Sequence, residues 1–131
     1  MAPMGLFGGL LDRFTEIVGD GPSYATFHFA SQQEGARLGA GAAPPELGDL
    51  LHRVDGILGH RSRLVAAGPD EVVVEVDGSP LVGGGHVGQG ILLGFIEGLL
   101  KAVLKRPFEG AIDRPGALPG RRLLRFHKAT P

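Results

Sequence analysis

Apolar residues recur at helical spacing through the longest hydrophobic stretch of the chain, residues 86–106. Residues that lie three and four positions apart share one face of a helix, and this pattern predicts a helix over 87–106. The face comprises Leu92, Phe95, Ile96, Leu99, Leu100 and Val103. Ile91, Leu93 and Leu104 widen the apolar surface beyond one stripe. We therefore expect other elements to cover this helix on more than one side, in the middle of the fold or in a dimer interface.

Three glycines, Gly90, Gly94 and Gly98, stand four residues apart on one ridge of the predicted helix. A glycine inside a helix costs about 1 kcal/mol relative to alanine, so three on one line need a structural reason. One explanation is that a strand or a second helix approaches the backbone closely. The other is that the ridge forms the floor of a pocket and leaves room for a ligand.

The length of this helix approaches the lower limit of roughly 18 residues for a membrane span. Gln89, Glu97 and Lys101 interrupt the apolar stretch, and a carboxylate in the middle of a bilayer is costly. Residues 1–11 also lack the basic start of a signal sequence. We therefore expect no membrane span.

Three further helices are predicted. Residues 6–18 show a short amphipathic pattern, and residues 45–58 show a clearer one that begins with proline and is followed by a glycine. Residues 23–38 fit either a strand or a helix. We favour the helix, with Ser23 as its N-cap and the glycines within 39–41 as its end, and the family resemblance described below also supports it.

Short alternating segments predict four strands. Residues 61–82 read as a hairpin that turns at 68–70. In its second strand Val72, Val74 and Val76 share one face, while the opposite face carries acidic residues. A short strand is predicted at residues 108–113 and a last strand at residues 121–128, joined by a turn.

Four strands and about four helices predict an α+β fold, in which helices cover one face of an antiparallel sheet. The 131 residues suffice for one domain, residues 1–131, with a real core. A net charge of −1 gives no electrostatic reason to expect nucleic acid as a partner. The lack of cysteine excludes disulfides, thiolate catalysis and cysteine-bound zinc, and it fits a cytoplasmic protein.

The histidines show no spacing typical of a metal-binding helix. They are His28, His52, His60, His86 and His127. His86 differs from the others because it opens the central helix after three glycines, where a neutral imidazole can bond to a ligand. The glycine-rich segment 83–90 contains a G-x-G-x-x-G match, but it lacks the lysine and hydroxyl residues of a P-loop. Nucleotide binding is therefore not expected.

Glu97 is the one carboxylate inside the apolar helix. A buried carboxylate must be paired or neutral, so we expect either a partly exposed position or an ion pair with Lys101, one turn later. A ligand contact is the alternative. No serine nucleophile and no pair of carboxylates is arranged for acid–base chemistry, so nothing in the chain favours an enzyme or a cofactor.

Three segments resemble the 4-vinyl reductase small-molecule-binding domains, which share a fold superfamily with transport-particle (TRAPP) subunits and heme nitric-oxide-binding domains. Residues 90–108 are similar to the family's helix G-x-x-x-G-F-x-x-G-L-L, which runs into R-P-aliphatic, with Phe108 in the aliphatic place. Residues 27–39 resemble an early helix of the family, and residues 124–127 resemble its closing strand. The resemblance covers roughly residues 10–128.

One departure from the family pattern concerns metal. Many members bind zinc through cysteines, whose places here hold approximately His86, Pro115 and Leu124. At most one of these residues is a possible ligand, so we expect no metal site.

The resemblance implies a homodimer with an apolar pocket between the helices and the sheet. Our first hypothesis is a non-enzymatic carrier or sensor for a hydrophobic small molecule, since such sites combine apolar walls with few polar groups. The expected walls are Phe27, Leu92, Phe95 and Leu99, with His28 and His86 as polar anchors.

Two other functions remain open. The protein could be a structural or assembly subunit of a protein complex, in which the central helix fills the core and no ligand binds. It could also be a heme-binding gas sensor with His28, His52 or His86 on the iron, although the chain is much shorter than such relatives. The sequence identifies neither the ligand nor a protein partner.

Overall fold

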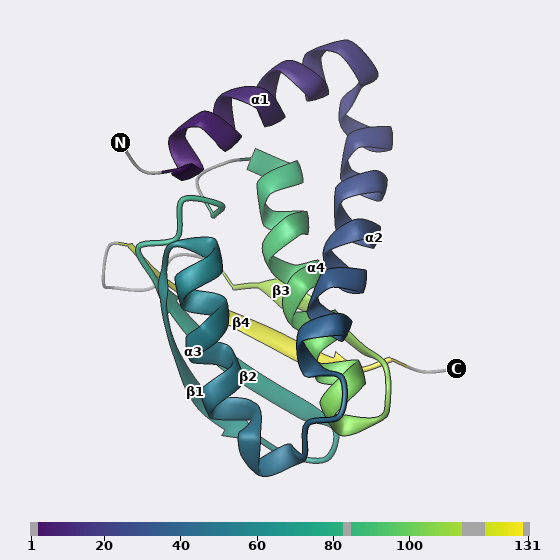
Figure 1. Cartoon of the computed structure of the whole chain (residues 1–131), viewed down its shortest axis with the longest axis vertical. Coiled ribbons are helices and arrows are strands. Elements are labelled where there is room, and N and C mark those ends of the chain that lie inside the picture. Colours follow the sequence, from purple (N-terminus) through teal and green to yellow (C-terminus); the bar gives the residue numbers. More distant parts are fainter. Residues whose placement is uncertain (1–2, 83–84, 114–119, 130–131) are drawn as a thin grey trace.

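Two helices joined by a single glycine open the chain: α1 (Pro3–Val18) and α2 (Asp20–Gly39) (Figure 1). The computed structural model describes residues 3–82, 85–113 and 120–129, and side chains from residue 9 onward within them. The apolar side chains expected on residues 6–7, the loop at 83–84 and the turn at 114–119 lie outside this description. Gly19 separates the two helices at φ +104°, a conformation that L side chains rarely adopt.

The structure confirms the helical alternative for residues 23–38, but its predicted start is wrong. The helix α2 begins at Asp20, so Ser23 lies within it and does not act as its N-cap. The Ser23 side chain is instead buried, and its hydroxyl has no hydrogen-bond partner in the described part of the chain. The sequence Asp-Gly-Pro at 20–22 forms the first turn of α2. Proline is well tolerated there because N–H groups in the first turn lack helical partners.

The next segment follows the prediction closely. A 3-10 turn (Pro44–Glu46) leads into α3 (Leu47–Leu58), and Gly59 ends that helix in the left-handed region at φ 75°. The hairpin β1 (Arg61–Ala67) and β2 (Glu71–Asp77) then precedes the central helix α4 (Gly85–Leu104). The chain closes with β3 (Phe108–Ile112) and β4 (Arg121–Lys128).

The four strands form one antiparallel sheet in the order β1-β2-β4-β3, which confirms the predicted fold class. Helices cover one face of it (Figure 1). Val72, Val74 and Val76 are fully buried against them, as the alternation predicts. The other face carries ion pairs between strands, such as Arg63 with Glu75 at 3.5 Å.

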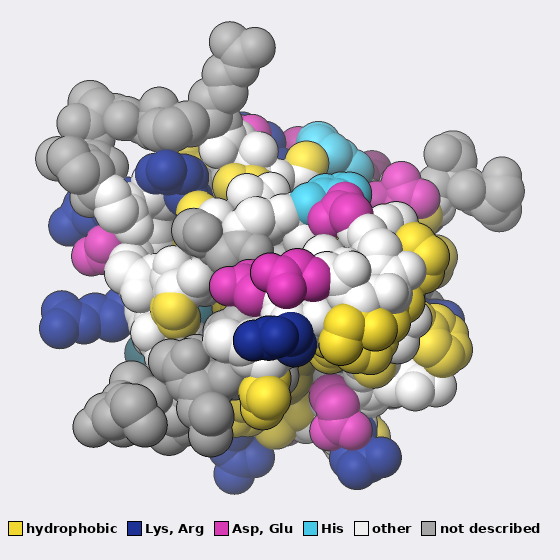
Figure 2. Space-filling view, turned by 90° about the horizontal axis from the view of Figure 1, so that it is seen from above, with side chains coloured by type: hydrophobic (Ala, Val, Ile, Leu, Met, Phe, Trp, Pro, Cys, Tyr) yellow, Lys and Arg dark blue, Asp and Glu magenta, His cyan; other side chains and the backbone are white. Residues whose placement is uncertain are grey.

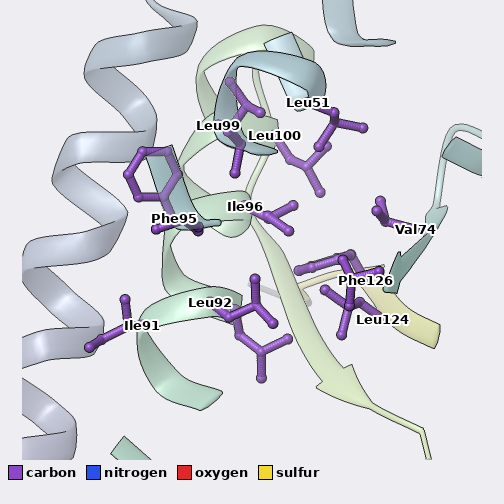
Figure 3. Close-up of a cluster of buried hydrophobic side chains, with 14 of the residues drawn as sticks. Leu51, Val74, Ile91, Leu92, Phe95, Ile96, Leu99, Leu100, Leu124 and Phe126 are labelled. Atoms are coloured by element: carbon purple, nitrogen blue, oxygen red, sulfur yellow. The ribbon is translucent and has the colours of Figure 1, made fainter. Parts of the chain in front are cut away.

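The central helix lies between the sheet and α2, so two sides of it are covered. Figure 3 shows Leu92, Ile96 and Leu100 on the side of the sheet residues Val74, Leu124 and Phe126, whereas Ile91 and Phe95 lie toward α2. Leu92, Ile96, Leu99 and Leu100 have no exposed surface. The helix is long and apolar enough to cross a membrane, but 78% of its most apolar window is buried inside the protein. Burial in the core accounts for its apolar character.

The glycine ridge of α4 is the contact surface for α2. A Cβ atom at Gly90 would lie 2.6 Å from the ring of Tyr24, and one at Gly94 would lie 2.6 Å from the backbone oxygen of His28. At Gly98 it would overlap the backbone carbonyl of Gln32. Close approach by a second helix therefore explains the ridge.

The interlocking is reciprocal. A Cβ atom at Gly35 of α2 would overlap the backbone carbonyl of Phe95, and one at Gly39 would lie 3.0 Å from the side chain of Leu99. Both helices thus present small residues at the same seam, and their backbones approach more closely than larger side chains would permit.

Replacing Gly98 by alanine should destabilise the protein by about 1–3 kcal/mol or more, because the added methyl group cannot enter the seam without moving a backbone. The matched control is Gly56→Ala in α3, where a Cβ would meet nothing within 4 Å. That change should stabilise the protein by about 0.4–1 kcal/mol by reducing the entropy of the unfolded chain. Urea unfolding measures both, and a Gly98→Ala variant as stable as the wild type would contradict this account of the seam.

Candidate functional site

A buried carboxylate at the middle of the molecule joins three elements. Glu97 of α4 is only 6% exposed. Its Oε1 accepts hydrogen bonds from Gln32 Nε2 at 2.8 Å and pairs with His28 Nε2 at 2.7 Å, both from α2. Its Oε2 accepts the backbone N–H of Gly110 in β3 at 2.8 Å. Each carboxylate oxygen therefore has a partner, as a buried charge requires.

The hydrogen bond from Gly110 also gives a partner to a backbone N–H group at the free edge of the sheet. The N–H groups of Asp113 and Ala129 bond to the carbonyls of Leu123 and Pro107, which places odd-numbered residues of β3 in the hydrogen-bonded pairs with β4. The N–H of Gly110 must then point away from β4. Glu97 occupies this outward donor and thereby attaches the edge strand to the central helix.

A polar and aromatic ladder continues this seam toward the start of α4. The ring of Tyr24 lies between two imidazoles, with its centroid 5.3 Å from that of His28 and 4.2 Å from that of His86. His86 Nδ1 lies 3.1 Å from an oxygen of Asp20. Burial, together with the charge of Glu97, raises the pKa of the Tyr24 phenol above its ordinary value.

A groove of about 260 Å³ opens beside Glu97, between α2, the end of α4 and the start of β3. Aromatic and aliphatic groups line part of it, and two amides, the carboxylate and one ammonium group complete the lining. The lining residues are Phe29, Gln32, Gln33, Ala36, Glu97, Gly98, Lys101, Pro107 and Phe108. We call this surface the Glu97 groove. Apolar walls with a few convergent polar groups are typical of small-molecule sites.

The environment of Glu97 differs from both structural predictions made for it, a partly exposed position and an ion pair with Lys101. The residue is neither partly exposed nor paired with Lys101, because its oxygens bond across the seam to α2 and β3. Lys101 is exposed, and no carboxylate in the described part of the chain lies within 4 Å of its ammonium group. The predicted ion pair within the helix is therefore wrong, and Lys101 faces the groove with its charge unpaired by described residues.

The four predicted apolar ligand residues lie in three different surroundings. Leu92 and Leu99 are fully buried in the core, and Phe95 is 8% exposed at the floor of a separate groove between α2 and α3. Phe27 is half-buried and packs edge-on against Phe14 of α1, at 5.1 Å between ring centroids. The structure therefore does not bring the four apolar residues together around one cavity among those described.

The two predicted polar anchors lie along the seam. His28 is bonded to Glu97, and it stacks on Tyr24. His86 is exposed and lines another cleft of about 280 Å³, next to Asp20 and the end of α1 (Figure 2 shows neighbouring histidine and acidic side chains on this face). One aromatic side chain, that of Tyr24, separates them, so they do not converge on one ligand.

Sequence reasoning missed most residues of the Glu97 groove. Phe29 is 61% exposed, which is unusual for a residue of its size, and it lies two positions beyond the predicted Phe27. A helical reading of 23–38 places Phe29, Gln32, Gln33 and Ala36 on one side, at spacings of three and four, and that signal was present in the sequence. The approach of Phe108 to this side required the tertiary fold.

Within the described residues, no group of three or more histidine, aspartate or glutamate side chains is placed to hold a metal ion. The chain matches no protein-family model and no curated protein sequence.

Glu97→Ala should cost about 3–5 kcal/mol of stability, because it leaves the three donors of the seam without their acceptor. Glu109→Ala, at an exposed neighbouring position in β3, should change stability by less than about 0.5 kcal/mol. Hydrogen exchange gives a specific readout, since the amide of Gly110 should lose protection in the first variant alone. Unchanged protection of that amide would show that Glu97 does not hold the edge strand.

A second buried titratable group, His60, predicts that the stability of the fold decreases in acid. His60 follows α3 with no side-chain exposure, and its Nε2 lies 3.3 Å from Asp55 without hydrogen-bond geometry at either ring nitrogen. Burial lowers the pKa of His60 below its ordinary 6.5, although Asp55 opposes the shift. The unfolded chain then binds a proton more readily, so stability should fall as the pH drops from about 6.5 toward the folded pKa.

Unfolding measured between about pH 7.5 and 5 checks this sign, because that range spans the ordinary histidine pKa. His60→Leu should flatten the pH dependence in this window. His52→Leu, which replaces an exposed histidine of α3, should retain the wild-type slope. An identical slope in the His60 variant would contradict the assignment.

Proposed function

We propose that this protein is a non-enzymatic binding domain, a carrier or sensor that holds a hydrophobic small molecule in the Glu97 groove. The observation that carries the proposal is the composition of the groove, in which Phe29 and Phe108 accompany a few fixed polar groups. The resemblance of residues 90–108 to the 4-vinyl reductase domains supports the same function. The proposal includes a cytoplasmic location for the protein.

The groove suits a molecule with an apolar body and one polar group. Phe29 of α2 and Pro107, which precedes β3, offer exposed apolar contact area, whereas Phe108 also lines the groove but is only 4% exposed. Gln33 and Lys101 offer donors at the rim. The hydrogen bond from Gln32 to Glu97 keeps that part of the lining rigid, which limits the entropy lost when a ligand binds.

The size of the groove limits its occupant. A volume of about 260 Å³ lies just below the usual range of roughly 300–1,000 Å³ for small-molecule sites. A compound with one or two rings, or a short alkyl chain, is therefore the expected class. A tetrapyrrole is too large for this groove as it stands.

We further propose that the protein is a homodimer that associates through α1. Leu10, Ile17 and Val18 of this helix are 63%, 76% and 42% exposed, although they are large apolar residues. Leu10 and Ile17 are seven residues apart and so lie on one face, while Leu11 of the neighbouring face is buried. An exposed apolar stripe on a peripheral helix is typical of an association surface.

The same stripe favours a second candidate function, that of an assembly subunit without ligand. The interior between the helices and the sheet is filled by side chains such as Leu92, Ile96 and Leu99, which have no exposed surface. The core of such a protein admits no ligand, and its helix α1 exposes apolar residues. Its sole function would then be to bind other protein chains. Direct observation of bound mass separates the two functions.

Native mass spectrometry of freshly purified protein should show a dimer that carries a small additional mass. In Phe29→Ala the additional mass should be lost or its occupancy reduced by about tenfold, because the largest exposed apolar wall of the groove is removed. Val65→Ala, which shortens an exposed apolar residue of β1, is the matched control and should retain the mass.

The same spectra test the dimer. Changing Leu10 and Ile17 together to serine should yield monomers, with the groove ligand still bound. A wild-type dimer without bound mass would favour the assembly subunit, and a bare monomer would count against both proposals. Bound mass that survives Phe29→Ala would place the ligand elsewhere.

A further inference from the structure

A second groove lies on the other flank of α2, between α2 and α3, and has a volume of about 360 Å³. Its lining is distinct from that of the Glu97 groove, with no residue in common. The lining residues are Glu34, Arg37, Leu38, Arg53, Ile57 and Phe95. We call it the arginine groove. Its volume falls within the usual range for small-molecule sites.

The floor of the arginine groove is apolar. Leu38 is half-buried, Phe95 is 8% exposed, and Ile57 is 53% exposed. The inward face of α3 consists of other residues, namely Leu47, Leu50, Leu51, Val54 and Leu58. Ile57 lies outside that face, so its exposed surface does not serve the core of this chain.

The walls of the groove carry an excess of positive charge. Arg37 comes from α2 and Arg53 from α3, and both side chains line the groove. The one carboxylate in the lining is Glu34, which lies 3.6 Å from Arg37 on the same helix. No carboxylate in the described part of the chain lies within 4 Å of the guanidinium of Arg53. The lining thus holds two cations and one anion.

We propose that the arginine groove binds a small apolar carboxylate, such as a medium-chain fatty acid. The alkyl chain lies along Leu38, Ile57 and Phe95, and the carboxylate pairs with Arg53, supported by Arg37. A guanidinium binds a carboxylate through two parallel N–H donors. Arginine therefore binds a carboxylate head group better than a single hydroxyl. Ile57 and Arg53 lie one turn apart on α3, so a single ligand can reach both.

Alternative occupants fit this lining less well. A neutral hydrocarbon would leave Arg53 without a partner, and a cation would meet two like charges. The volume of about 360 Å³ is too small for a docked helix, which is about 10 Å across. This site is independent of the Glu97 groove, so either can exist without the other.

Titration of the ¹⁵N-labelled full chain with octanoate, followed by NMR, tests the proposal. The amide signals of Leu38 and Ile57 should shift in a saturable manner. The signals of Gln32 and Gly98, at the Glu97 groove, should shift less than these. Octanol is the matched neutral probe and should bind about tenfold more weakly, since it lacks the charge that pairs with arginine. Acetate, which has the charge without the chain, should cause no saturable shift.

Arg53→Gln should weaken octanoate binding by about tenfold and leave octanol binding unchanged. Ile57→Ser should weaken the binding of both probes, because it removes part of the apolar floor. The control is Arg13→Gln on α1, an exposed arginine outside the groove, which should bind octanoate as the wild type does. Arg53 and Ile57 are exposed, so these variants should keep the dispersed spectrum of the folded chain.

Equal affinity for octanol and octanoate, or undiminished octanoate binding in Arg53→Gln, would overturn the assignment of an anion. The absence of any saturable shift up to about 5 mM, above the roughly millimolar affinity expected for a ligand of this size, would overturn the site itself. Shifts centred on the Glu97 groove would also refute it while supporting the function proposed there.

Discussion

The contact between α2 and α4 is the constraint on which the rest of the structure depends. Three glycines of α4 and two of α2 remove the side chains that would hold the helices apart, and the backbones meet directly. This contact places Tyr24, His28 and Gln32 on the ridge, within reach of groups that belong to α4. Each glycine costs helix stability, and the dense packing along the seam offsets that cost.

The close seam also makes it possible to bury Glu97. A charged group inside the protein is tolerated only if its oxygens are satisfied, and the donors come from α2 and from the edge of the sheet. The same carboxylate therefore links a helix pair to a strand at the far end of the sheet order. Gly110 must remain small, since a Cβ there would lie 2.5 Å from the ring of Phe126.

Dense packing has a consequence for function. Because side chains fill the space between α4 and the sheet, the grooves described here open at the surface, on two flanks of α2. One flank carries exposed aromatic surface beside a buried carboxylate, and the other carries two arginines over an apolar floor. One helix thus contributes to the core seam, to both candidate sites and, through Phe27, to the support of α1.

Local patterns in the sequence determined the elements of this protein. Spacing of three and four residues predicted α3 and α4, alternation predicted the buried face of β2, and glycines marked helix ends, because these signals depend only on neighbours along the chain. Only the tertiary structure decided what those faces meet. Glu97 and Lys101 satisfy the spacing for an ion pair, yet donors from residues 28, 32 and 110 hold the carboxylate. Likewise, Leu92 and Leu99 are buried in the core, and Phe29 lines a groove. Whether a side chain is buried depends on elements that are distant in the sequence.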